Sequence, residues 1–156
     1  MADYDNKSRA SGVVACPFAV VTATPTPLAV DLLDYGSCNF HTFVGAGGIT
    51  FSATNKIEFK VTESDDDVTY TAAPDDALIL DPGATAPGDT GIVRSIIAAH
   101  ASADTATPIV GYRGKKRYVK CTPVFGGTHG TGTLVGVIAE RGHAYHGPIG
   151  ASSVET

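Results

Sequence analysis

The clearest pattern in the chain is a strict alternation of apolar and polar residues over 57–62 (IEFKVT). Successive side chains of a strand point to opposite faces, so this segment predicts a strand with one face in a core and the other in water. The acidic stretch 63–67 (ESDDD) predicts a turn, and 68–71 begins the returning strand of a hairpin. The residues predicted to contribute to the core are Ile57, Phe59 and Val61, with Tyr118 or Val119 and Val135 or Val137.

Shorter runs of β-branched and apolar residues predict further strands. The segment 92–99 also fits a helix, but its β-branched residues and its neighbours favour a strand. Pro17 places the first predicted strand at a sheet edge or a bend, and 74–89 is predicted to be a long acidic loop. The other predicted strands are 13–23, 28–33, 39–44, 109–112, 117–125 and 131–139, and 126–130 (GGTHG) is predicted to join the last two as a hairpin loop.

The number and spacing of these strands predict the fold class. Eight or so short strands, separated by Gly and Pro, indicate an all-β protein built as an antiparallel β-sandwich, with a jelly roll as the favoured version. A length of 156 residues corresponds to one domain. Because both ends are polar and lack periodicity, the predicted division is a flexible N-terminal arm at 1–12, a sandwich domain at 13–142 and an extended C-terminal tail at 143–156.

The composition indicates which contacts and which cellular location to expect. Charged residues make up 17% of the chain, against about 25% in a typical domain, which suits a β protein with much of its surface against neighbours. No apolar run approaches the roughly 20 residues of a membrane span, so no membrane partner is expected. A polar stretch precedes Cys16 where a signal peptide needs an apolar one, so a cytoplasmic protein is expected. The three cysteines, Cys16, Cys38 and Cys121, are then half-buried thiols or, alternatively, crosslinks to another chain.

Motifs for catalysis and for cofactors are incomplete. The Gly-rich stretches 45–48 and 126–132 lack the residues that hold phosphates, and no Gly-x-Ser-x-Gly elbow exposes a nucleophile. His143 and His146 have no third ligand nearby, and the acids at 65–67 lack the calcium-loop pattern. The sequence therefore predicts no catalytic residue, no cofactor and no metal, and the protein is not expected to be an enzyme.

Charge is strongly segregated along the chain. Residues 61–93 contain eight acids and no Lys or Arg, whereas 113–120 (RGKKRYVK) holds five of the eleven basic residues. A patch of one sign usually meets a surface of the opposite sign. Nucleic acid is one candidate partner, with Tyr112 and Tyr118 available for stacking on bases. Alternatively, the basic run is only an exposed hairpin that binds no partner. The net charge of −5 and the short patch favour an acidic protein surface and no specific nucleic acid.

The residues predicted for this partner interface are therefore the five cations and the acids of the turn. On the strand that follows, Lys116, Tyr118 and Lys120 should share one face, and Arg117, Val119 and Cys121 the other. The acidic partner is expected to be the 61–93 region of a sister subunit or a larger protein. The predicted interface residues are Arg113, Lys115, Lys116, Arg117, Lys120, Asp65, Asp66 and Asp67.

Several segments together resemble a family of small virion structural proteins of tailed bacteriophages, over roughly residues 20–149. The segments are 28–33 (LAVDLL), 40–45, 63–66, 111–120 (GYRGKKRYVK), 126–132 (GGTHGTG) and 141–143 with Pro148. The resemblance implies a virion component. Small β-sandwich proteins in that setting are commonly cement or decoration proteins, which implies the major capsid protein as partner, a homo-oligomer, the capsid surface as location and synthesis in the bacterial host cytoplasm.

Two other functions remain open. One is a neck or tail structural protein, such as a head-completion or terminator subunit. The other is a module that binds carbohydrate or a host surface, because jelly rolls often serve as lectins. The absence of Trp and the presence of only six Tyr weaken the second alternative.

Overall fold

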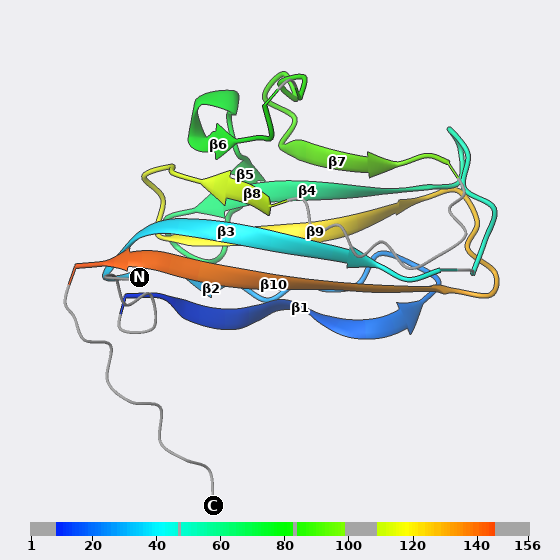
Figure 1. Cartoon of the computed structure of the whole chain (residues 1–156), viewed down its shortest axis with the longest axis horizontal. Coiled ribbons are helices and arrows are strands. Elements are labelled where there is room, and N and C mark those ends of the chain that lie inside the picture. Colours follow the sequence, from blue (N-terminus) through cyan, green and yellow to red (C-terminus); the bar gives the residue numbers. More distant parts are fainter. Residues whose placement is uncertain (1–8, 47, 83, 99–108, 146–156) are drawn as a thin grey trace, which may run out of the picture.

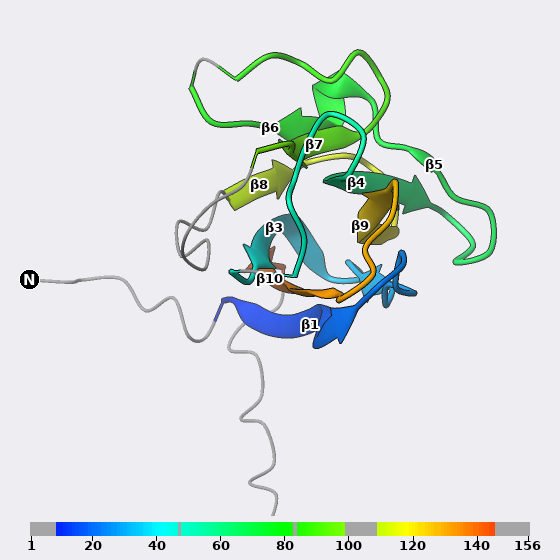
Figure 2. The ribbon, with the colours of Figure 1, turned by 90° about the vertical axis from the view of Figure 1, so that its right-hand side faces the viewer.

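A computed structural model describes residues 9–46, 48–82, 84–98 and 109–145 of the chain (Figure 1). The strands form two antiparallel sheets that pack face to face as a sandwich, which an end-on view shows as two layers (Figure 2). In sheet A the strand order is β1-β10-β3-β8-β6. In sheet B it is β2-β9-β4-β5, and β7 also pairs with β4. The predicted all-β antiparallel sandwich is confirmed.

The strands are defined as follows. Sheet A contains β1 (Ser11–Val21), β3 (Tyr35–Val44), β6 (Leu78–Ile79), β8 (Ile109–Tyr112) and β10 (Thr133–Ala144). Sheet B contains β2 (Val30–Asp31), β4 (Lys56–Ser64), β5 (Thr71–Ala72), β7 (Ile92–Ile96) and β9 (Tyr118–Gly126). One 3-10 turn, η1 (Asp75–Ala77), precedes β6.

The connections give the sandwich jelly-roll topology. The chain passes from sheet A to sheet B and back through β1, β2, β3 and β4, and again through β7, β8, β9 and β10. Without the two-residue strands β5 and β6, the orders are 1-10-3-8 and 2-9-4-7, so the first strand lies beside the last. This nesting of two Greek keys is what the jelly-roll prediction requires.

The core lies between the inner faces of the two sheets. The alternation at 57–62 has the predicted effect, because Ile57, Phe59 and Val61 are fully buried. Val119, Val135 and Val137 are buried opposite or beside them, which confirms the predicted core. Sheet A contributes Phe40 and Val44, among others, to this core.

Some predicted boundaries differ from the structure. The loop 126–130 does not form a hairpin, because β9 belongs to sheet B and β10 to sheet A. Both neighbours of β9 are already β2 and β4, and those of β10 are β1 and β3, so the chain must cross between sheets there. The predicted loop 74–89 contains η1 and β6, and the returning strand after the acidic turn begins at Thr71.

The two ends of the domain extend further than the sequence suggested. β1 starts at Ser11, within the predicted arm 1–12, and β10 runs to Ala144, into the predicted tail 143–156. Residues 1–8 and 146–156 lie outside the described residues, so the mobility of the arms stays a prediction. As Pro17 indicated, β1 is an edge strand, and its register with β10 shifts on both sides of Cys16. Within the described part of the chain, no helix has the length and apolar character needed to cross a membrane.

Candidate partner-binding end of the sandwich

The predicted basic run forms the connection from β8 to β9 at the left-hand end of the sandwich in Figure 1. The acidic turn after β4 and the segment between β2 and β3 lie beside it. Together they line an open cleft of about 560 Å³. Its lining includes Leu33, Asp34, Asp65, Arg113, Lys115 and Lys116. The fold thus brings the predicted acidic and basic residues of one chain to one end.

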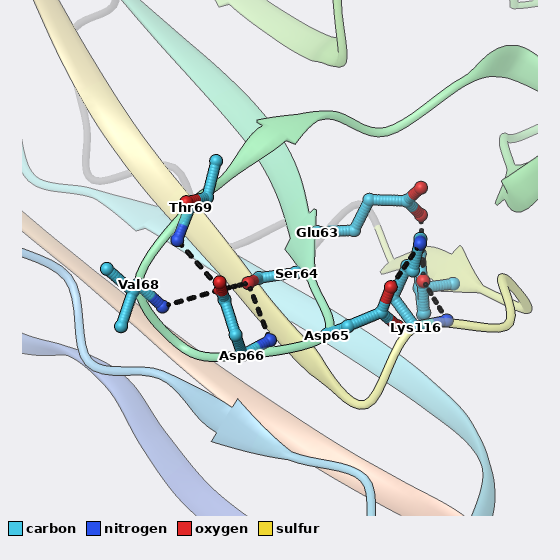
Figure 3. A network of polar contacts seen from close by, with 8 residues as sticks. Glu63, Ser64, Asp65, Asp66, Val68, Thr69 and Lys116 are labelled. Carbon is cyan, nitrogen blue, oxygen red and sulfur yellow. Dashed lines mark hydrogen bonds and ion pairs between the residues drawn. The ribbon is translucent and has the colours of Figure 1, made fainter.

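Asp66 organises the acidic turn (Figure 3). Its Oδ1 accepts hydrogen bonds from the backbone N–H groups of Thr69 at 2.8 Å and Val68 at 2.9 Å, and from the Ser64 hydroxyl at 2.8 Å. These donors stabilise the ionised carboxylate and lower the pKa of Asp66 from 3.8 to about 2. Asp67 follows with φ of 58°, a left-handed conformation that Asp tolerates in turns. The run of acids is therefore a hydrogen-bonded turn.

Two lysines of the basic run pair with this turn. Lys116 Nζ donates to Asp65 Oδ2, an ion pair that raises the pKa of the lysine (Figure 3). Lys120 Nζ lies 3.8 Å from Asp67 Oδ1 and 3.7 Å from the centre of the Tyr70 ring. The predicted contact of the basic run was with a sister subunit or a larger protein, whereas in the structure these two lysines pair with the acidic turn of their own chain.

Arg117 pairs with an acid that the sequence analysis did not select. Its Nε and Nη2 donate to Asp31 Oδ1 and Oδ2 at 2.9 and 2.7 Å, the two-pronged geometry that guanidinium groups form with carboxylates. The hydrogen bond from Arg117 lowers the pKa of Asp31. The guanidinium also lies 4.8 Å from the Tyr118 ring centre. Arg117 had been predicted to share a face with Val119 and Cys121. This prediction is wrong, because Arg117 precedes β9 and is exposed, whereas Val119 and Cys121 are buried.

Buried Tyr112, the last residue of β8, holds the β8–β9 loop through its hydroxyl group. The Tyr112 hydroxyl donates to Glu63 Oε2 at 2.8 Å and accepts from the Lys116 N–H at 3.3 Å. Burial, and then the bond to Glu63, raise the pKa of Tyr112. A Cβ at Gly114 would lie 2.2 Å from the same hydroxyl, so only glycine lets the loop pass this close. Glu63 is only 8% exposed, so its carboxylate depends on this donor.

Two of the predicted cations, Arg113 and Lys115, have no acidic side-chain partner among the described residues. Arg113 Nε donates to the Asp76 carbonyl at 3.1 Å, and its backbone N–H donates to Ala77. Lys115 is exposed and makes no hydrogen bond or ion pair with any other described residue. Both line a second hollow of about 290 Å³ that borders Glu63 and Asp76. Arg113 and Lys115 are thus the basic side chains of this end that can meet an external acidic group.

The described part of the chain contains neither a candidate metal site nor an exposed thiol. No group of three or more His, Cys, Asp or Glu side chains could hold a metal ion there. The three cysteines are free and fully buried, where half-buried thiols had been predicted, so none is exposed for a crosslink. Burial raises the pKa of Cys38 to about 12.

Sequence reasoning missed Asp31, Glu63 and Tyr70 as partners of the basic run. Only the fold brings them there: Asp31 is 86 residues from Arg117. Comparison with known proteins adds nothing to this description, since no protein-family model, curated protein or solved structure matches the chain.

Proposed function

We propose that the protein is a structural component of a tailed-bacteriophage virion, a cement or decoration protein that binds the shell of the major capsid protein. The proposal joins the resemblance of the chain to virion proteins with one structural observation. At the β8–β9 end, three cations are paired within the chain, whereas Arg113 and Lys115 are free to bind an acidic partner.

The paired cations have a different role from the one that the sequence suggested. Lys116, Arg117 and Lys120 hold the loop against Asp65, Asp31 and Asp67 and so fix its shape. A loop that is already ordered loses less conformational entropy when it binds. The proposed anchor therefore consists of Arg113 and Lys115, and this proposal is supported by the intrachain pairing of the other three cations.

The test is attachment of purified protein to particles that lack it. Replacing Arg113 and Lys115 together by Ala should leave the circular dichroism spectrum unchanged and weaken attachment by about tenfold or more, as loss of charge pairs excluded from water predicts. The matched control replaces Lys56 and Lys60, two lysines of the outer face of β4, so that the net charge changes equally. Equal loading of the anchor variant and the wild type would contradict the proposed anchor.

Two further measurements separate the alternatives. A stained gel of purified particles should show this protein in numbers comparable with the major capsid protein, whereas a few copies per particle would favour a neck or tail ring. Retention on DNA at about 0.15 M salt should be weak, because two free cations release few counterions. Tight binding to DNA there would contradict an acidic protein partner.

A further inference from the structure

The outer face of sheet A is apolar along β1 and the neighbouring part of β10, where a sandwich normally meets water. On β1, Val14, Phe18 and Val20 are 49%, 48% and 66% exposed, and Leu134 on the neighbouring β10 is 43% exposed. The pairing of Val14 with Ile138 and of Val20 with Leu134 places these side chains on one face. Antiparallel sheets with one solvated face usually carry polar residues at such positions.

The side chains of this face are held in place. The Phe18 ring lies 5.2 Å from the Phe43 ring, and it covers Gly136 so closely that a Cβ there would come within 2.5 Å of it. Val20 and Leu134 lie in the same way over Gly132 and Gly45. The glycines thus leave room for the large apolar side chains to pack against the backbone of the sheet.

Charge is almost absent from this face. β1 contains no charged residue. On the outer side of β10 the acid is Glu140, whose Oε2 lies 3.5 Å from Nε2 of His41 on β3. Because the chain has a net charge of −5, two copies can approach each other with least repulsion at this face.

We propose that the outer face of β1, β10 and β3 packs against the same face of a second copy, related by a two-fold axis. An apolar surface bordered by one internally paired acid is complementary to itself, as a two-fold contact requires. The register shifts around Pro17 interrupt the free edge of β1, so contact by the face is favoured over pairing of the two edges. The inference is independent of the capsid proposal, since it concerns the protein in solution.

The available apolar area is that of a small contact between two copies. With about 200 Å² for a large exposed side chain, the four exposed residues present roughly 400 Å², the size of the largest apolar patch on a typical monomer. Two such patches bury roughly 800 Å² together, less than the roughly 1,000 Å² of a standard specific interface, which corresponds to a weak dimer. Half-buried Phe43 and Ile138 on the same face enlarge the contact.

The experiment is sedimentation velocity of the full chain between about 1 and about 100 μM, the range of moderate affinities. The wild type should form a dimer, and Val20→Lys should raise the dissociation constant by about tenfold or more, because each copy would place a charge in the apolar contact. The added lysine lowers the net negative charge, so a loss of association cannot come from general repulsion.

The matched control is Val124→Lys, the same substitution on the outer face of sheet B, where Val124 pairs with Glu58. It should associate like the wild type, and circular dichroism should show that both variants keep the fold. A monomeric wild type, an oligomer larger than a dimer, or a Val20→Lys variant that associates like the wild type would overturn the inference. Capsid attachment, tested with Arg113 and Lys115, can fail or succeed separately.

Discussion

The two outer faces of the sandwich differ in chemistry although the two inner faces match. The outer face of sheet B carries Lys56, Glu58 and Lys60 on β4 and Lys120 and Thr122 on β9. The outer face of sheet A carries apolar side chains on β1 and β10. Strict alternation makes a strand with one dry and one wet face, and sheet B obeys it. Sheet A departs from it at its β1 edge, where Val14, Phe18 and Val20 of β1 and Leu134 of β10 face outward.

Many of the charged side chains of sheet B and of the neighbouring basic loop form ion pairs within the chain. Lys56 pairs with Glu58 at 2.6 Å, and the cations that follow β8 pair with the acids around β4 and β2. A charged surface with internal pairs interacts well with water and offers few groups to a partner. This difference indicates that the apolar face, together with Arg113 and Lys115, is a stronger candidate for contact with other proteins than the charged face.

The largest predicted effects test whether the inner faces are equivalent. Phe40→Ala in sheet A and Phe59→Ala in sheet B each remove a fully buried ring. Each should lower the free energy of unfolding by about 3–5 kcal/mol, because both leave a cavity in a packed core. Urea unfolding measures the two values. A loss below about 1 kcal/mol for one of them would show that its sheet is loosely packed.

The next prediction tests the order of the apolar face. In Gly136→Val the new side chain would meet the Phe18 ring, so the ring must leave its position on sheet A. The free energy of unfolding should fall by about 1–3 kcal/mol, as for overpacked sites, and self-association should weaken with it. Gly12→Val is the control on β1, since a Cβ there meets nothing within 4 Å. Equal effects of the two substitutions would contradict the packing of Phe18 over Gly136.

A similar effect is expected beneath the basic loop between β8 and β9. Tyr112→Phe removes the hydroxyl that donates to the buried Glu63 and accepts from Lys116. The unpaired carboxylate should cost about 1–3 kcal/mol of unfolding free energy. Tyr118→Phe, on the outer face of β9, should stay within about 0.5 kcal/mol of the wild type. If both variants unfold alike, the Tyr112 hydroxyl does not hold the loop.

The sequence predicted the charged face better than the apolar one, for a physical reason. Alternation at 57–62 identifies both faces of β4 because the two faces differ in polarity. The segment 13–23 is apolar at most positions, so its pattern indicates a strand without showing which side is exposed. At the basic end, the run 113–120 was found by composition, but its pairing with Asp31 depends on contacts between distant segments, which periodicity does not report.

The last prediction concerns pH and affects only the turn at the end of sheet B. The Asp66 carboxylate accepts three hydrogen bonds, so its pKa is about 2 in the folded chain and 3.8 when it is free of them. Between these values the unfolded chain binds more protons than the folded chain, so the free energy of unfolding falls as the pH drops. The contribution of Asp66 is complete above about pH 4 and lost by about pH 2.

In Asp66→Asn the amide oxygen can still accept hydrogen bonds without titrating, so the decrease of the unfolding free energy with falling pH should be less steep. A residual slope should remain from Asp31, whose pKa the bond to Arg117 also lowers. Asp65→Asn, the control in the same turn, should keep the part of the slope that Asp66 causes. Urea unfolding at pH values between 2 and 5 measures these slopes, and an unchanged slope in Asp66→Asn would contradict the role of this turn.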